Sequence, residues 1–447
     1  MSPQELKKKA LAYHCKGKPG KVAIRSTKPC TSGEELSLAY TPGVAQPCLE
    51  IKREKELVWK YTARSNTVAV VSDGTAVLGL GNIGAEAGLP VMEGKAVLFK
   101  HFADIDAIPV CLNRVAGPDG RTDPEKLIAA AATLEPSFGG FNLEDIAAPA
   151  CFKVERTLKK MLSIPVFHDD QHGTAIISLA AILNGLDVVG KKIGECRFVV
   201  NGVGAAGLAC SRFYLTAGAK PENMLLCDSK GVIHTGRTDL NEEKKPFARK
   251  TSARTLADAL KGADIFLGFS VPDCVTPAMI KSMNKDAIVF AMANPTPEIF
   301  PDVALAAGAA LAGTGRSDFP NQINNVLGFP GIFRGALDVR ARDINEEMKL
   351  AASHALAELA RAAIPAKVRA ELEKAYPADA RRGLFRTPAG LRRDMLIPKP
   401  FDPRVVPHVA RKVAEAAISS GVAQLAIGDF DAYEKAVARR IAASREE

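Results

Sequence analysis

The stretch Arg197-Phe198-Val199-Val200-Asn201-Gly202-Val203-Gly204-Ala205-Ala206-Gly207 decides the fold of this chain. Its apolar first half is typical of a buried strand, and the glycines that follow have the spacing G-x-G-x-x-G. A helix is predicted directly behind it over 207–216, and a further strand over 224–227. In this arrangement the first glycine turns the chain, the second admits a pyrophosphate, and the third packs helix on strand. The stretch therefore predicts a dinucleotide-binding α/β domain.

The candidate cofactor-binding positions lie in this turn and after the next strand. Amide groups at a helix N-terminus receive phosphates, and Asp228 ends the following strand, where an acid binds the ribose 2′-hydroxyl of NAD. Ser229 and Lys230 could instead surround the 2′-phosphate of NADP, and the positive charge of Lys230 slightly favours NADP over NAD. The candidate positions in the turn are Gly202, Val203, Gly204, Ala205, Ala206 and Gly207.

A second G-x-G-x-x-G, formed by Gly79, Gly81 and Gly84, is weaker because its context is poor. Asp104 lies twenty residues further on, where a ribose-binding acid is sought. The segment behind these glycines, however, contains Gly88 and Pro90, which disfavour a helix. We expect a tight structural loop near the substrate here.

Alternating strand and helix patterns indicate an α/β fold with mostly parallel sheets. Residues 1–165 form an N-terminal α/β domain, residues 166–340 a doubly wound Rossmann-type domain that binds NAD(P), and residues 341–447 a helical extension. The expected elements include strands over 68–72, 95–102, 108–112, 196–201, 264–268 and 287–293. The expected helices cover 124–134 behind an Asp123 cap, 173–184 closed by Gly185, 252–261, 345–363, 407–420 and 431–444.

The composition excludes several classes of protein. The chain has 447 residues, 47% hydrophobic and 24% charged, a formal net charge of +9, and 6% aromatic residues. Few aromatics, and a single basic run at Lys7 to Lys9 in an amphipathic stretch, argue against a nucleic-acid partner. Nine widely spaced cysteines without a Cys-x-x-Cys favour a reducing compartment. No signal peptide and no run of about 18 apolar residues are visible, so we expect a cytoplasmic protein without a membrane span.

Two acidic pairs bracket a predicted helix. Glu144-Asp145 and Asp169-Asp170 have no lysine or arginine beside them and adjoin apolar segments. Carboxylates of this kind suit a hard cation, Mg²⁺ or Mn²⁺. Because adjacent carboxylates on a regular helix splay apart, a shared metal requires a loop or a strand end here. Solvated surface charge is the ordinary alternative.

A zinc hydrolase is a competing hypothesis for the same segment. His168 and His172 have the i, i+4 spacing of zinc-protease ligands, but Asp169 stands where that motif places a glutamate. Pro165 upstream and Gly173 downstream also leave no room for a central helix.

Lys95 and Tyr40 each allow a functional and a purely structural interpretation. Lys95 follows a glycine turn and enters an apolar run, so a lowered pKa could make it a base. An ordinary surface lysine is the alternative. Tyr40 precedes the turn at Pro42-Gly43, where it could simply pack against the turn.

Together these segments resemble the malic enzymes, specifically their shorter bacterial form. The matching pieces occur in family order over roughly residues 35–340, with one more near the C-terminus. They are residues 40–45, 72–84, 92–96, 142–146, 168–175, 293–296, 323–326 and 397–402.

The resemblance implies oxidative decarboxylation of L-malate to pyruvate and CO₂ with reduction of NAD(P)⁺, in a homodimer. Lys95 matches the general base and Tyr40 the general acid. Asn294 matches a position at malate or the nicotinamide, and Asn324 or Asn325 one that contacts malate. The residues that match the metal ligands, in the N-terminal domain and at its border, are Glu144, Asp145 and Asp170.

The sequence departs from the family at one position. The larger eukaryotic enzymes carry an arginine after the Asp73-Gly74 turn, and here Thr75 and Ala76 follow. With 447 residues we expect no phosphotransacetylase-like domain. A nucleotide-binding module that has lost catalysis is the remaining alternative.

Overall fold

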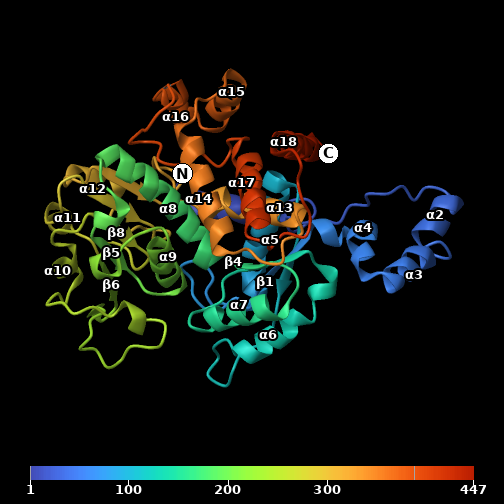
Figure 1. The fold of residues 1–447 in the computed structure, drawn as a ribbon, viewed down its shortest axis with the longest axis horizontal. Helices are drawn as coiled ribbons and strands as arrows, with labels where there is room; N and C mark the ends of the chain where they lie inside the picture. Colours follow the sequence, from blue (N-terminus) through green and yellow to red (C-terminus); the bar gives the residue numbers. More distant parts are fainter. Residues whose placement is uncertain (1, 387, 447) are drawn as a thin grey trace.

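Two parallel sheets joined by a long helix make up the body of the protein (Figure 1). The computed structural model describes residues 2–386 and 388–446. The first sheet has the strand order β2-β1-β3-β4, and every neighbouring pair is parallel. The pairing places residues 166–168, beyond the expected domain boundary at 165, in this first sheet. Its strands are β1 (Thr67–Ser72), β2 (Asp106–Cys111), β3 (Gly140–Leu143) and β4 (Val166–His168).

The second sheet has the order β10-β9-β8-β5-β6-β7 and confirms the doubly wound α/β prediction. All its pairs are parallel except β6–β7. The order reverses between β5 and β8, and ligands of such sheets bind at the carboxyl ends of the strands beside this point. Its strands are β5 (Phe198–Asn201), β6 (Met224–Asp228), β7 (Gly231–Val232), β8 (Ile265–Gly268), β9 (Ile288–Ala291) and β10 (Leu311–Thr314).

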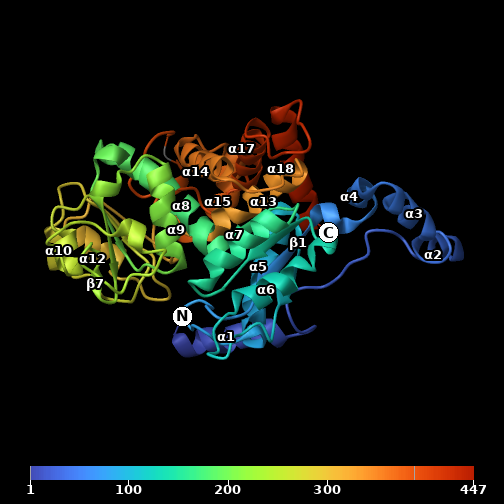
Figure 2. The same cartoon turned by 60° about the horizontal axis from the view of Figure 1, so that its bottom comes forward.

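Helices cover both sheets and form the C-terminal extension. In the extension, α14 and α17 pack beside α13 and α8 (Figures 1 and 2). The helices of the body are α5 (Ala85–Ala103), α6 (Pro124–Ala132), α7 (Ala150–Met161), α8 (Asp169–Val189), α9 (Ala205–Thr216), α10 (Leu256–Leu260), α11 (Pro277–Lys281), α12 (Pro301–Ala306) and α13 (Phe329–Asp338). Those of the extension are α14 (Glu346–Arg361), α15 (Ala366–Ala375), α16 (Pro377–Arg381), α17 (Val405–Ser419) and α18 (Phe430–Glu446).

Helix α5 corrects the sequence-based expectation for residues 85–102. A poor helix and then a strand were expected here, yet one helix runs through Gly88 and Pro90. Met92, Ala96 and Phe99 recur at helical spacing and are buried in the core. Their packing outweighs the helix-breaking propensity of Pro90, which removes only one backbone hydrogen bond.

Helix α8 is longer than expected at both ends. It starts at Asp169 and continues past Gly185 to Gly190, whose φ of +70° suits a glycine cap. A Cβ on Gly185 would lie 3.1 Å from Ile288 Cδ1, so this glycine serves close packing against the second sheet. The helix is long and apolar enough to cross a membrane, but 67% of its most apolar window is buried inside the protein.

The N-terminal helices lie outside the body. Helix α1 (Pro3–Cys15) lies at the lower edge of the molecule in Figure 2. Helices α2 (Gly33–Ala39), α3 (Ala45–Arg53) and α4 (Val58–Tyr61) form an arm that projects from the first domain (Figures 1 and 2). None of the residues in these arm helices is buried. The arm exposes large apolar side chains, among them Leu36, Leu38, Tyr40 and Leu49.

Candidate active site

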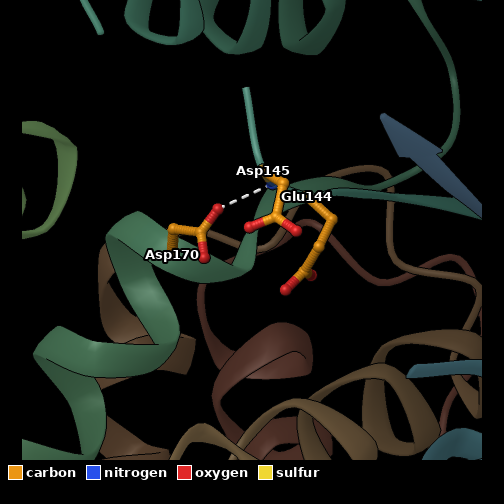
Figure 3. A group of neighbouring side chains, drawn as sticks. All are labelled: Glu144, Asp145 and Asp170. Carbon is orange, nitrogen blue, oxygen red and sulfur yellow. Dashed lines mark hydrogen bonds between the residues drawn. The ribbon is translucent and has the colours of Figure 1, made fainter. Parts of the chain in front are cut away.

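The acidic residues of the two predicted pairs meet at the carboxyl edge of the first sheet. Glu144 and Asp145 follow β3, and Asp170 lies in the first turn of α8, directly after β4 (Figure 3). One ligand oxygen from each of the three residues lies within 4.8 Å of the others. The backbone N–H of Asp145 donates to Asp170 Oδ2 at 2.8 Å. Because β3 and β4 are parallel neighbours, their ends bring the two pairs together.

A local backbone turn lets the adjacent Glu144 and Asp145 side chains face the same space. Asp145 has φ +54°, a left-handed conformation that is uncommon outside glycine. The backbone N–H of Ala76 donates to the Asp145 carbonyl oxygen at 2.9 Å and holds this conformation in place. The requirement for an irregular backbone, expected from the sequence, is therefore met.

The cluster fits a divalent cation. Burial and the neighbouring Asp170 raise the pKa of Asp145 to about 7, and burial raises the pKa of Glu144 well above its usual range. Asp145 Oδ2 is buried without a hydrogen-bond partner. Three crowded carboxylates with an unpartnered oxygen repel one another until a cation neutralises them, and an all-oxygen set suits Mg²⁺ or Mn²⁺.

Lys95 is the cation nearest to this cluster. It lies within α5, not on the expected turn, and its Nζ is 2.8 Å from Glu144 Oε1 and 2.6 Å from Asp169 Oδ2. The Nζ also lies 4.4 Å from the centre of the Phe329 ring. Burial lowers the Lys95 pKa, but the charges of Asp169 and Glu144 outweigh burial and raise it. Lys95 is thus a largely buried lysine that pairs with two carboxylates.

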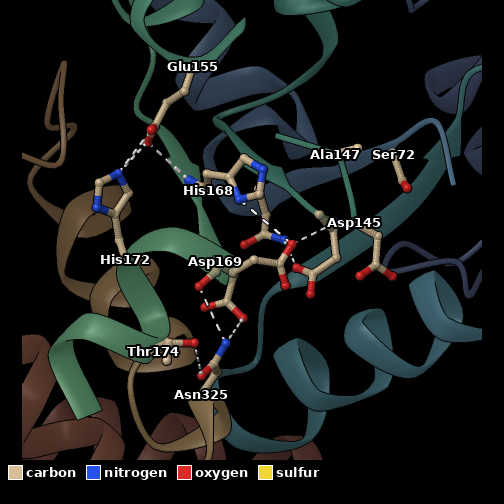
Figure 4. Close-up of polar contacts among 12 residues, drawn as sticks. Ser72, Asp145, Ala147, Glu155, His168, Asp169, His172, Thr174 and Asn325 are labelled. Atoms are coloured by element: carbon tan, nitrogen blue, oxygen red, sulfur yellow. Dashed lines mark hydrogen bonds and ion pairs between the residues drawn. The ribbon is translucent and has the colours of Figure 1, made fainter. Parts of the chain in front are cut away.

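The asparagines of the nucleotide domain reach the same place. Asn325 Nδ2 donates to Asp169 Oδ2 at 3.1 Å, and Thr174 Oγ1 donates to Asn325 Oδ1 at 3.1 Å (Figure 4). The Asn324 side chain accepts from the backbone N–H of Val326. The loop after β10 therefore borders the carboxylate cluster through Asn325.

The nucleotide turn has the geometry that its glycines predict. Gly202 has φ +100°, and a Cβ there would collide with the Phe269 carbonyl. A Cβ on Gly207 would collide with the carbonyl oxygen of Gly202, so these two positions require glycine. Gly204 faces open space and precedes the N-terminus of α9, where backbone N–H groups can receive phosphate.

Asp228 is held by two cations that the sequence did not connect to it. It accepts from Arg237 Nη1 at 2.7 Å, from Arg237 Nη2 at 3.0 Å and from Lys244 Nζ at 2.7 Å. Although burial raises its pKa, these partners hold the pKa of Asp228 at about 2. Ser229 is exposed, and Lys230 Nζ donates to Asp239 at 2.9 Å.

The first glycine motif forms the expected tight loop. Gly74 leaves no room for a Cβ against the Gly84 carbonyl, and Ile83 and Gly84 both donate to the Gly74 carbonyl oxygen. A Cβ on Gly79 would lie 2.9 Å from the Asn294 carbonyl oxygen, so the loop packs on the nucleotide domain. Asp104 pairs with Lys100 and lies outside this loop.

The zinc hypothesis fails, but not for the reason expected from the sequence. A helix does start at Asp169, so His172 lies in its first turn. His172 is committed elsewhere: Nε2 lies 2.8 Å from Glu155 Oε1, and Nδ1 lies 3.2 Å from Lys349 Nζ. Burial lowers the pKa of His172, so the neutral ring donates to Glu155 and accepts from Lys349.

Three residues around the cluster were missed by sequence reasoning. Asn142 Nδ2 donates to Glu144 Oε2 at 2.8 Å, and Glu155 and Lys349 flank His172. For Glu155 a signal existed: it lies on the buried face of α7 beside Phe152 and Leu158. A charged residue on an apolar helix face requires a buried partner.

Tyr40 lies apart from Lys95 within one chain. It follows the last residue of α2 on the projecting arm and is 71% exposed, whereas Lys95 is buried in α5 in the body (Figures 1 and 2). The structure therefore brings the predicted base and metal ligands together, but not the predicted acid.

The fold and the site define an α/β protein in which a carboxylate cluster at the edge of one parallel sheet contacts a loop of a Rossmann-type sheet. The family model "Malic enzyme, N-terminal domain" matches residues 19–159, and "Malic enzyme, NAD binding domain" matches residues 171–376. The chain belongs to the malic enzyme family.

Relatives of both nucleotide preferences resemble the chain equally well. The NADP-dependent malic enzyme of Salmonella typhimurium is 52% identical over 96% of this chain, and the NAD-dependent malic enzyme of Rhizobium meliloti is 51% identical over 96%. The chain spans about half the length of these relatives, 54% in each case. The crystal structure of malic enzyme from Pyrococcus horikoshii matches with a TM-score of 0.87 and 42% identity, covering 99% of this chain and 97% of that one.

Proposed function

We propose that this protein oxidises and decarboxylates L-malate to pyruvate and CO₂ while reducing NAD(P)⁺. The observation that carries the proposal is the pairing of Lys95 with Asp169 and Glu144 inside the carboxylate cluster, beside the loops of the nucleotide domain. Hydride leaves C2 for the nicotinamide, the hydroxyl proton goes to Lys95, the C3–C4 bond breaks to release CO₂, and C3 then takes up a proton.

The residues that would hold a divalent metal are Glu144, Asp145 and Asp170, through carboxylate oxygens. When bound, the metal polarises the C2 oxygen and gives the electrons of the breaking C3–C4 bond a sink. Asp169 is not part of this set of neighbouring carboxylates, and its Oδ2 pairs with Lys95 and accepts from Asn325. It orients the lysine and does not bind the metal.

Lys95 serves as the general base in this proposal. A base must be neutral to accept the hydroxyl proton, and the carboxylates alone keep Lys95 protonated. A bound divalent cation neutralises the charge of Glu144 and so weakens the attraction that keeps Lys95 protonated. We infer that the Lys95 pKa falls when the metal is bound. The Phe329 ring covers one side of the amine.

An absorbance assay tests the reaction. L-malate, Mn²⁺ and either NAD⁺ or NADP⁺ are mixed with the protein, and we expect the reduced-nicotinamide band to rise together with pyruvate. EDTA should abolish the rise. Nucleotide binding without any rise, with either nucleotide, would contradict the proposal and favour a binding module without catalysis.

We propose a homodimer in which the arm carries Tyr40 into the partner's site, where it protonates C3. Tyr40 is exposed and far from the site of its own chain, and the arm leaves Leu36, Leu38 and Leu49 exposed. Exposed apolar surface of this kind is typical of subunit contacts. In a two-fold dimer each arm reaches the other subunit, so both sites would be completed reciprocally.

We further propose that the site favours NADP. Arg237 and Lys244 neutralise Asp228, which removes the free acid that would bind a 2′-hydroxyl and leaves two cations where a 2′-phosphate would lie. Lys230 adds a third positive charge at the same strand end.

The variant Arg237→Gln tests the nucleotide preference. We expect the NADP dissociation constant to rise about tenfold or more, since a charge-assisted hydrogen bond is lost. NAD should bind no worse, because Asp228 is partly released. Arg254→Gln is the matched control, as Arg254 donates to backbone carbonyls of the same segment. Equal weakening of both nucleotides would contradict the assignment.

The proposed enzyme is cytoplasmic and built from a substrate and metal domain (1–165), an NAD(P) domain (166–340) and a helical extension (341–447). All nine cysteines are free thiols, which supports a reducing compartment. Strand β4 and the first turn of α8 belong to residues 166–340 but pack with the N-terminal domain. Asp170 in this turn therefore joins Glu144 and Asp145 in the metal site.

A further inference from the structure

A buried row of charged side chains runs behind the carboxylate cluster and links three helices. Glu155 of α7 is 4% exposed and Lys349 of α14 is 2% exposed, and His172 of α8 lies between them. Figure 4 shows the Glu155 end of this row next to His168 and His172. Burying two charges is costly unless each is paired, and apolar side chains in the same place would avoid this cost.

Lys349 reaches the row from the C-terminal extension. Asn345 caps α14 by accepting from the backbone N–H of Met348, which sets where the helix begins and where Lys349 points. Ser353, one turn later, donates to the Ile176 carbonyl of α8 at 3.0 Å. The two contacts fix α14 along α8, and Lys349 also pairs with Glu346 at the surface.

With Lys349 as an ammonium, the hydrogen-bond directions in the row follow. An ammonium can only donate, so Lys349 donates to Nδ1 of His172. The proton of the neutral ring then lies on Nε2, which donates to Glu155. Glu155 is the anion that accepts from the His172 end of this chain of donors, and Glu346 pairs with Lys349 at the other end.

Glu155 accepts hydrogen bonds from two positions at the start of α8. Besides His172, its Oε1 accepts the backbone N–H of His168 at 3.2 Å. His168 precedes α8 and makes no side-chain cap, so a glutamate from another helix satisfies an amide at this helix end. Asp169, Asp170 and Gln171 are the residues between these two positions.

We propose that Glu155, His172 and Lys349 are positioning residues that orient Asp169 and Asp170, so that the C-terminal extension sets the metal affinity of the site. The inference rests on the proposed metal site at Glu144, Asp145 and Asp170. Groups that orient metal ligands typically change metal affinity by about 10- to 100-fold when removed. A merely structural role would change stability and leave the metal affinity unchanged.

The test measures Mn²⁺ binding to the full chain without malate or nucleotide, from the electron paramagnetic resonance signal of free Mn²⁺. We expect Glu155→Gln to raise the Mn²⁺ dissociation constant about tenfold, and Lys349→Met to raise it by about two- to tenfold. Lys399→Met is the matched control. Lys399 is a 5% exposed lysine of the same extension, paired with Asp379 at 2.8 Å, and its loss should not change Mn²⁺ binding.

The variant Asp170→Asn distinguishes a failure of the positioning role from a failure of the proposed metal site. If Asp170→Asn binds Mn²⁺ like the wild type, the metal site itself is wrong. If Asp170→Asn loses Mn²⁺ while Glu155→Gln and Lys349→Met retain wild-type affinity and circular dichroism, only the positioning role is overturned. Should Glu155→Gln fail to fold, Lys349→Met decides the question alone.

Discussion

Replacing Lys95 by alanine is expected to lower kcat about a thousandfold, within the range for loss of a general base. The Lys95 ammonium is also the cation that pairs with Glu144 and Asp169. In Lys95→Ala the ammonium no longer competes with a divalent metal for these carboxylates. Mn²⁺ should therefore bind more tightly to Lys95→Ala than to the wild type. Lower turnover with tighter metal binding is a combination that simple unfolding cannot produce.

Steady-state kinetics and Mn²⁺ titration of the same preparation provide the measurement. Lys100→Ala is the control, because Lys100 lies on the same helix but pairs with Asp104 and Asp106 at the surface. It should keep wild-type kcat and metal affinity. A kcat for Lys95→Ala within a factor of a few of the wild type would remove Lys95 from the mechanism.

Mixing two inactive variants is expected to restore activity if the arm completes the partner's site. Tyr40→Phe should lower kcat about a hundredfold through loss of the acid. In a random mixture with Lys95→Ala, half of the dimers carry one chain of each kind. One site of such a dimer then has both residues intact, so about a quarter of the wild-type activity should return.

The control mixture combines Lys95→Ala with Asp170→Asn. Lys95 and Asp170 belong to the same chain's site, so no dimer of this mixture holds an intact site and no activity should return. Turnover is measured after subunit exchange in both mixtures. An inactive Tyr40→Phe and Lys95→Ala mixture, with exchange demonstrated, would mean that Tyr40 does not act across subunits.

The sequence predicts the fold where local pattern and packing agree, and fails where packing overrides the pattern. The apolar runs that form β5 and β8 and the glycine turn at 202–207 were placed correctly. Helix α5 was not, because the burial of Phe99 and Met92 is a tertiary effect that Pro90 conceals. Gly185 was taken for a cap, although its neighbours Ile288 and Leu311 lie more than 100 residues away.

The same limit applies to the site. The sequence marks the two acidic pairs only as candidates for one hard cation. The strands that they follow, β3 and β4, are not among the predicted strands, and their parallel pairing brings the two pairs together in the folded chain. The ion pairs of Asp228 and the row behind His172 could not be predicted either, since Arg237, Lys244 and Lys349 reach them only in the folded chain. Sequence spacing identifies residues whose side chains suit a chemical role, whereas tertiary contacts determine the partners of these residues.

One site is expected both to oxidise and to decarboxylate malate. The test is nuclear magnetic resonance of L-malate labelled with ¹³C at C4 and incubated with protein, Mn²⁺ and NADP⁺. We predict labelled CO₂ and bicarbonate in equal amount to unlabelled pyruvate and reduced nucleotide. Label retained in oxaloacetate while nucleotide is reduced, or no consumption of malate at all, would contradict the account.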